Sequence, residues 1–515
     1  MSGQRLRIAG PEILAEIIEP CPQSQLPGDA YEFRHVLLRD AAYSLLTDED
    51  LKLCHHFAAG FLEENGESDP QVLAEHYDRA GEPRTALPYY VRSAEQAFLR
   101  SDLRNADEAC RRAIAGGADG AELGAIKTVE SMVSLSRGAV NDALDSGRAA
   151  LLLLSPGSPR WYHTLTNQAG TASLVGDLSY VRDLVATLDH ATPQPEAAAD
   201  FVIANSLVAA VYAVFGAREL AESYLQRART HIKDAAPSLR GDARAEMFLA
   251  KSSGYISLFV GNNPWEAKLA MAVAVDAALR TGYPRSVVTE RCTLSLIEST
   301  LGAHEESLAL ARWAYEEARR LDEPYLVETS TMYLVSALIE KDDAESLAEA
   351  CQHIADLEVL MPENLLIGAL TQVLVAILFL HTGDPATAMN RLLRADELLC
   401  AMPGLRPISL GYVLSSWLSL GEVTKALAAA KEGELLLFRL GSAGVYEPRL
   451  RLGIARAYAA TGQDEEARAA LRDAVAELSA RAACIPDPAA RARYLEHNAV
   501  NRALTALSLE WRLSE

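Results

Sequence analysis

The chain has 515 residues, of which 50% are hydrophobic and only 6% aromatic, and its formal net charge is −22. This acidic balance repels phosphate backbones and anionic lipid surfaces, so it argues against nucleic acid or a membrane as a direct partner. The length exceeds what one compact core holds, yet no linker rich in Pro, Gly and Ser divides the chain, which favours a repeat array.

Residues 1–30 carry Arg5 and Arg7 without a following apolar segment. We predict no secretory signal there and interpret residues 1–30 as a leader or the remnant of an upstream domain. The seven cysteines along the chain are scattered and never form a Cys-x-x-Cys pair. This pattern predicts reduced, mostly buried thiols in a cytoplasmic protein.

Residues 31–69 are predicted to form a helical junction before the array. They contain His35 and the run Cys54-His55-His56, which raises the question of a metal site. Adjacent side chains on a helix point about 100° apart, and no second Cys or His stands at a ligand spacing. We interpret these residues as helix packing and a solvated face, and we predict no metal and no other cofactor.

Residues 70–483 show a glycine about every 40 residues, a period typical of stacked helical hairpins. One position lacks its glycine, and there Lys341-Asp342-Asp343 supplies polar residues that also favour a turn. The predicted turn glycines are Gly138, Gly176, Gly216, Gly261, Gly302, Gly383, Gly421 and Gly462.

A fixed frame of residue types surrounds these glycines, with a small residue seven positions before, a large one four before, and small ones five and twelve after. Around Gly216 the frame is Ala209, Tyr212, Ala221 and Ala228. Gly81, Gly383 and Gly462 have similar frames. Glycine ends the first helix in a left-handed conformation, and the small residues let two helices approach closely.

This frame resembles the tetratricopeptide repeat, whose signature combines a small residue, a tyrosine, a turn glycine and two alanines. The likeness covers about residues 70–480. It implies an all-α, α-α superhelical solenoid of roughly ten hairpins, with a period near 40 rather than 34 residues. The apolar stretch 365–380 fits this frame and is predicted to be a buried solenoid helix rather than a membrane span.

Segments at both ends resemble a second family. Residues 31–46, 53–56 and 72–83, together with 482–495, are similar to the segments that flank the repeat array in bacterial STAND-type ATPase regulators. The resemblance implies that the array senses a signal for an ATPase linked to a kinase, cyclase or helix-turn-helix output. Residues 484–515 are predicted to cap the array, and 485–495 to serve either as that cap or as a docking motif for the output domain.

Catalytic motifs are absent from the sequence. It has no Gly-x-x-x-x-Gly-Lys-[Ser/Thr] loop, no Asp-Phe-Gly and no Gly-x-Ser-x-Gly. Acidic clusters such as Asp464-Glu465-Glu466 stand at predicted helix starts, where they face the helix dipole. We predict that the chain is not an enzyme. Two alternatives are a Ser/Thr kinase or adenylate cyclase whose catalytic part lies upstream, and a free-standing adaptor.

Four aromatic residues on predicted first helices are candidates to line the concave groove of the array: Trp161, Tyr255, Tyr333 and Tyr412. Packing between repeats is the alternative role for each. The predicted partner is a protein or peptide, including a kinase, ATPase or cyclase output domain, or else a small-molecule ligand.

Overall fold

The computed structural model describes residues 17–21, 31–234, 241–360 and 365–511. The chain divides into two compact units, Met1–Val129 and Glu130–Glu515. Most of the predicted leader 1–30 lies outside the described residues, as do the last four residues of the predicted cap. The helix α7 (Gly120–Ser136) spans the division between the units.

The first unit opens with a small antiparallel pair of strands, in which Ile18 lies opposite Phe33. The segment predicted to be helical from residue 31 therefore begins as a strand, because its aromatic residues pair with an apolar segment upstream. Thr47 and Asp50 form a capping box at the start of the helix that begins at Asp48. The elements are β1 (Ile18–Pro20), β2 (Tyr31–Phe33), α2 (Val36–Ser44), α3 (Asp48–Glu64), α4 (Pro70–Arg79), α5 (Pro83–Leu99) and α6 (Leu103–Ala115).

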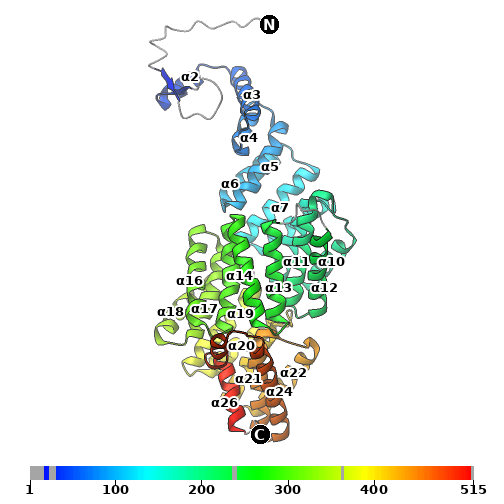
Figure 1. Ribbon diagram of the computed structural model, residues 1–515. Coiled ribbons are helices and arrows are strands. Elements are labelled where there is room, and N and C mark those ends of the chain that lie inside the picture. Colours follow the sequence, from blue (N-terminus) through cyan, green and yellow to red (C-terminus); the bar gives the residue numbers. More distant parts are fainter. Residues whose placement is uncertain (1–16, 22–30, 235–240, 361–364, 512–515) are drawn as a thin grey trace. The chain divides into compact units, whose positions relative to one another are not determined.

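The second unit is a series of helical hairpins, which confirms the predicted all-α solenoid (Figure 1). Each hairpin has a first helix, a turn and a second helix, and from α9 to α24 the odd-numbered helices are first helices. The helices after α7 are α8 (Val140–Leu153), α9 (Pro159–Leu174), α10 (Leu178–His190), α11 (Ala198–Val214), α12 (Arg218–Asp234), α13 (Ala243–Phe259), α14 (Pro264–Thr281), α15 (Pro284–Thr300), α16 (His304–Leu321), α17 (Pro324–Lys341), α18 (Ala344–Leu360), α19 (Leu365–His381), α20 (Pro385–Leu399), α21 (Arg406–Ser419), α22 (Val423–Leu440), α23 (Glu447–Ala460) and α24 (Asp464–Ala483). Short helices η1 (Pro195–Ala197) and η3 (Gly444–Tyr446) precede α11 and α23, and α25 (Pro488–Glu496) and α26 (Ala499–Glu510) follow.

Most predicted turn residues adopt the left-handed backbone that the frame requires. All the predicted turn glycines except Gly261 have positive φ, and Asp342 has φ 57° at the position that lacks a glycine. The prediction for Gly261 is wrong, since Asn262 holds the left-handed conformation there with φ 54°. Asparagine tolerates this conformation, and Asn263 then caps α14 by accepting a hydrogen bond from the amide of Glu266.

The small and large positions of the frame are buried around Gly216 and Gly462, while Phe379, the large residue before Gly383, is partly buried. Around Gly216, the three alanines are 0% exposed and Tyr212 is 5% exposed. Around Gly462, Ala467 is 1% exposed and Tyr458 is 7% exposed. Small residues thus stand where paired helices approach most closely, and large residues fill the space beside them.

Replacing Ala467 with Leu should overpack this helix crossing and lower the free energy of unfolding by about 1–3 kcal/mol. The matched control is Ala480→Leu on the same helix, because Ala480 is exposed. Urea denaturation of the three proteins, followed by circular dichroism, measures the difference. Equal midpoints for the two variants would contradict the close packing assigned to Ala467.

Within the described residues, one segment is long and apolar enough to cross a membrane by length and composition, Pro195–Val214. Inside the array, 78% of its most apolar window is buried, and core helices pass the same test. The segment predicted to be a buried solenoid helix is α19, with Ala369, Val373 and Ala376 all at 0% exposure.

The prediction of mostly buried thiols is wrong. All seven cysteines are free, but only Cys110 and Cys292 are buried. The exposed ones are Cys54, Cys351, Cys400 and Cys484. The hairpin frame fixes which positions are buried, and these four fall on outward-facing positions or next to helix ends.

The array turns back on itself, so that C-terminal segments pack against the turns of earlier hairpins. A side chain at Gly404, between α20 and α21, would overlap the carbonyl oxygen of Val214. The amide of Asn498 donates to the carbonyl oxygen of Thr300 at 3.2 Å. In Figure 1 the last helices lie beyond the ends of α13 and α14. Hairpins about five places apart in the chain therefore meet, and we call this contact the seam.

The seam also explains why residues in the segment 485–495 are buried. Ile485 is 0% exposed and Tyr494 is 2% exposed, and both belong to the main apolar core. A side chain at Gly302 would overlap the carbonyl oxygen of Arg493. This segment packs onto the turn between α15 and α16, rather than forming only a polar end.

Candidate ligand-binding site

The first helices of successive hairpins line a cavity of about 510 Å³ in the second unit. Its wall takes residues from α9, α11, α13, α15, α17, α19 and α21, and from η3 and the C-terminal helices beyond it. Cavities of about 300–1,000 Å³ with mostly apolar walls and a few polar groups are typical of small-molecule sites. The cavity is therefore the candidate functional site.

Three of the four predicted groove residues, Tyr255, Tyr333 and Tyr412, line this cavity. Trp161 does not, and its buried side chain instead packs edge-on against Tyr162, with ring centroids 5.0 Å apart. A first helix presents one side to the interior and another to its neighbours, and the residue type alone does not distinguish the two. The binding role of the three tyrosines stays a prediction.

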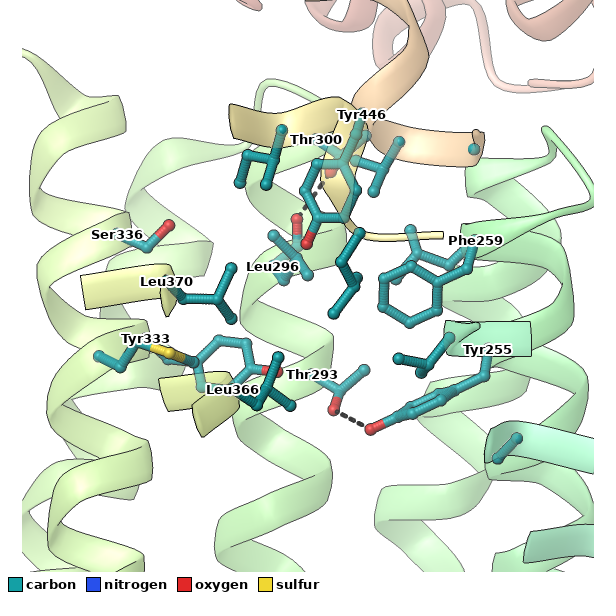
Figure 2. A pocket seen from close by; sticks show the side chains of 18 of the residues that line it. Tyr255, Phe259, Thr293, Leu296, Thr300, Tyr333, Ser336, Leu366, Leu370 and Tyr446 are labelled. Carbon is teal, nitrogen blue, oxygen red and sulfur yellow. Dashed lines mark hydrogen bonds between the residues drawn. The ribbon is translucent and has the colours of Figure 1, made fainter. Parts of the chain in front are cut away.

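Sequence reasoning missed Tyr446, which η3 carries into the interior. Figure 2 shows its ring between the helices, with its hydroxyl directed toward Leu296. The ring centroid lies 6.2 Å from that of Phe259. Gly444 makes this approach possible, since a side chain there would overlap the backbone of Phe259. Tyr446 stands outside the hairpin frame, and only the pair of glycines at 441 and 444 hints at an unusual loop.

Hydroxyl groups gather at the centre of the cavity. The hydroxyl of Tyr255 lies 3.3 Å from Oγ1 of Thr293. In Figure 2 the hydroxyls of Tyr255 and Tyr333 point toward Thr293 from two sides, and the hydroxyl of Tyr446 ends nearby at Leu296. Burial raises the pKa of Tyr333 and of Tyr446, and neighbouring tyrosines add to each shift. These phenols are neutral hydrogen-bond donors.

A buried ion pair borders the same wall. Nζ of Lys251 lies 2.8 Å from Oε1 of Glu290, whose residue is 1% exposed. Burial opposes the charge of Lys251, but Glu290 and Tyr255 outweigh it and raise the lysine pKa. The pair joins α13 to α15, so that it fixes the spacing of two helices that line the cavity.

At the seam, Arg481 connects segments far apart in the chain. Its guanidinium donates to Oε2 of Glu447 at 2.7 Å and to Oδ1 of Asn262 at 3.0 Å. The hydroxyl of Ser442 also donates to Asn262, at 2.6 Å. Burial raises the pKa of Glu447, but Arg481 and Arg451 outweigh it and lower the pKa. These contacts hold the turn after α13 against α23 and α24 at the cavity wall.

The buried carboxyl of Glu328 on α17 leads us to predict that the stability of the protein depends on pH. Its residue is 6% exposed, and burial raises its pKa to about 7. Between pH 4.5 and 7 the folded state then binds more protons than the unfolded state, so stability falls as the pH rises. We expect Glu328→Gln to remove this fall and to be more stable than the wild type by about 2–3 kcal/mol at pH 8.

The measurement is a series of urea titrations from pH 4.5 to pH 8. The exposed Glu345 on α18 gives the matched control, Glu345→Gln. If Glu328→Gln and the wild type have parallel pH profiles, the carboxyl of Glu328 is not destabilised by burial.

In the first unit, the candidate metal residues do not assemble. Nδ1 of His55 lies 3.1 Å from Nδ1 of His76, while Cys54 and His35 are exposed. Burial, aided by charged neighbours, lowers the pKa of both His55 and His76. Throughout the described ranges, no group of three His, Cys, Asp or Glu side chains is arranged to hold a metal ion.

No protein-family model and no curated protein matches the chain. Solved structures similar to it include a Rap protein complexed with Competence and Sporulation Factor, with 12% identity over 68% of this chain and 98% of that one, and a TM-score of 0.41. The apo quorum sensor NprR from B. thuringiensis shares 13% identity over 61% of this chain and 97% of that one, with a TM-score of 0.38. A STAND protein with a tetratricopeptide repeat sensor from Pyrococcus horikoshii shares 13% identity over 87% of this chain and 55% of that one, with a TM-score of 0.28. These scores are too low to carry function from those proteins to this chain.

Proposed function

We propose that this chain is a recognition scaffold, in which the inner face of the helical array binds a partner protein, a peptide or a small ligand. One observation carries the proposal: first helices from seven successive hairpins converge on a single, mostly apolar cavity that tyrosine and threonine hydroxyls also line. A binding surface of this kind works by shape and a few polar groups, and it needs no catalytic residue.

We also propose that binding modulates an ATPase or kinase-type output, as the likeness of residues 31–46, 53–56, 72–83 and 482–495 to STAND regulators implies. The seam offers a physical route for such coupling. The cavity wall includes Asn262 from an early hairpin together with Arg481 and Tyr446 from late ones. A ligand that touches both sides of the seam has a different affinity for the array with the seam closed and for the array with the seam open. Its binding therefore shifts the equilibrium between these two states.

The experiment is a selection on the immobilised full chain with two libraries, one of random peptides and one of drug-sized organic molecules. Binders are then titrated against the wild type and against Leu370→Trp, which fills the cavity from α19. We expect a concentration-dependent rise in melting temperature for the wild type and a loss of affinity in the variant. If the binders have the same affinity for Leu370→Trp as for the wild type, or if no binder is found, the inner face is not the recognition surface.

A further inference from the structure

We propose that the cavity takes a compact, uncharged and largely apolar organic molecule that carries a carbonyl or other oxygen acceptor. This inference rests on the proposed function and deepens it by naming the chemical class of the ligand. Three observations support it: the size of the cavity, the balance of charge around it, and the hydroxyl donors at its centre.

Size favours a compact ligand over an extended segment. The cavity of about 510 Å³ lies within the range of about 300–1,000 Å³ that holds small molecules. The seam limits the interior, because η3 enters it and Gly444 lies against the backbone of Phe259. An extended peptide would need the continuous groove that this contact interrupts.

Charge balance favours an uncharged ligand. The ammonium group of Lys251 is already paired with Glu290, and the guanidinium of Arg481 is paired with Glu447. An ionic ligand entering this apolar space would lose its hydration without gaining a free counter-charge from either pair.

The remaining charges on the wall are of opposite sign. The guanidinium carbon of Arg449 lies 4.1 Å from the centre of the Tyr412 ring. Glu340 lines the same cavity, and both residues act on the pKa of Tyr412 in opposite directions. The wall therefore offers a ligand no excess of either sign.

Hydrogen-bond donors specify the polar group of the ligand. The hydroxyls of Tyr255, Tyr333 and Tyr446 all lie in the interior, the first two facing Thr293 and the third at Leu296. Apolar side chains such as Leu366 and Leu370 surround them (Figure 2). A phenol of this kind donates readily, so an oxygen acceptor placed beside one of them gains a hydrogen bond, while the apolar body of the ligand contacts the leucines. A carbonyl oxygen on a ring system meets both requirements.

Nile red serves as the probe because it is neutral, largely apolar and carries a ring carbonyl. We expect saturable binding to the full chain, seen as enhanced fluorescence, and weaker binding of the anion 1-anilinonaphthalene-8-sulfonate. Leu370→Trp should weaken Nile red binding about tenfold or more, because the new side chain fills the space. Exposed apolar side chains on α2 and α3 also attract the dye. Only the part of the dye binding that Leu370→Trp removes is therefore assigned to the cavity.

Conservative variants test the hydroxyl donors without changing the shape of the cavity. Tyr333→Phe and Tyr446→Phe should each raise the dissociation constant of Nile red about 3- to 10-fold. The control is Tyr224→Phe, since that hydroxyl donates to Asp189 at 2.8 Å and lies outside the cavity. If circular dichroism shows that Leu370→Trp is unfolded, Ser336→Phe fills the cavity from α17 instead.

Each outcome decides between the proposals. Tighter binding of the anionic dye, or Nile red binding that is the same in Tyr333→Phe and Tyr224→Phe, would overturn the inferred ligand class. If Nile red shows no saturable binding while selected peptides bind the wild type and lose affinity in Leu370→Trp, the inference fails and the proposed recognition function stands. If neither the dye nor any library member binds the interior, both fail.

Discussion

Replacing Arg481 with Met should lower the free energy of unfolding of the second unit by about 3 kcal/mol. The substitution leaves Glu447, which is 1% exposed, without one of its two guanidinium partners, and it removes one of the two donors to Asn262 at the seam. Arg451 still pairs with Glu447 at 2.6 Å, which holds the loss near the low end of the range for broken buried pairs. Urea denaturation followed by circular dichroism gives the value.

Two further variants separate the ion pair from general effects of losing a charge. Arg472→Met on the same helix removes an exposed arginine and should change stability by less than about 0.5 kcal/mol. In the double variant Arg481→Met/Glu447→Gln, the neutral amide no longer needs a cation, so the combined loss should be smaller than the sum of the single losses. Additive losses would mean that Arg481 and Glu447 do not act as a pair.

Replacing Gly444 with Ala should destabilise the protein more than the same change at Gly441, three residues earlier in the same loop. Both glycines have positive φ, 51° and 70°, so each alanine costs about 1–2 kcal/mol of backbone strain. Only at Gly444 would the new methyl group overlap the backbone of Leu258 and Phe259, while nothing lies within 4 Å at Gly441. The overlap adds about 1–3 kcal/mol.

The pair of variants also has a readout at the cavity. Gly444→Ala must push η3 away from α13, which moves Tyr446 and should weaken Nile red binding relative to Gly441→Ala. Thermal unfolding and dye titration of both variants measure the two effects. Equal melting temperatures and equal dye affinities would show that η3 does not press closely on Phe259.

Sequence reasoning recovered the hairpins because local rules determine them. Each hairpin requires a left-handed turn residue, small residues at the helix crossing and a polar N-cap, and each of these residue types stands at a fixed position in the repeat. Asp342 meets the first requirement where the glycine is missing. At Gly261 the reasoning failed by one residue, because Asn262 satisfies the same backbone requirement.

The candidate site could be predicted only in part. Tyr255, Tyr333 and Tyr412 lie on first helices, and the repeat frame alone places those helices on the inside. Tyr446 could not be found in this way, since it reaches the cavity only because hairpins about five apart meet at the seam. Such a contact depends on the accumulated curvature of the array, which no local pattern in one repeat records.

Contact between early and late hairpins is what makes the interior a cavity, and one crosslink tests it most directly. The double variant Asn262→Cys/Ser442→Cys, in a chain whose four exposed cysteines are replaced by Ser, joins positions whose side chains now lie 2.6 Å apart. After mild oxidation, peptide mapping by mass spectrometry should find a disulfide between residues 262 and 442 in most molecules. If the seam is open, both thiols stay free, and that result would contradict the contact between early and late hairpins and the binding site that depends on it.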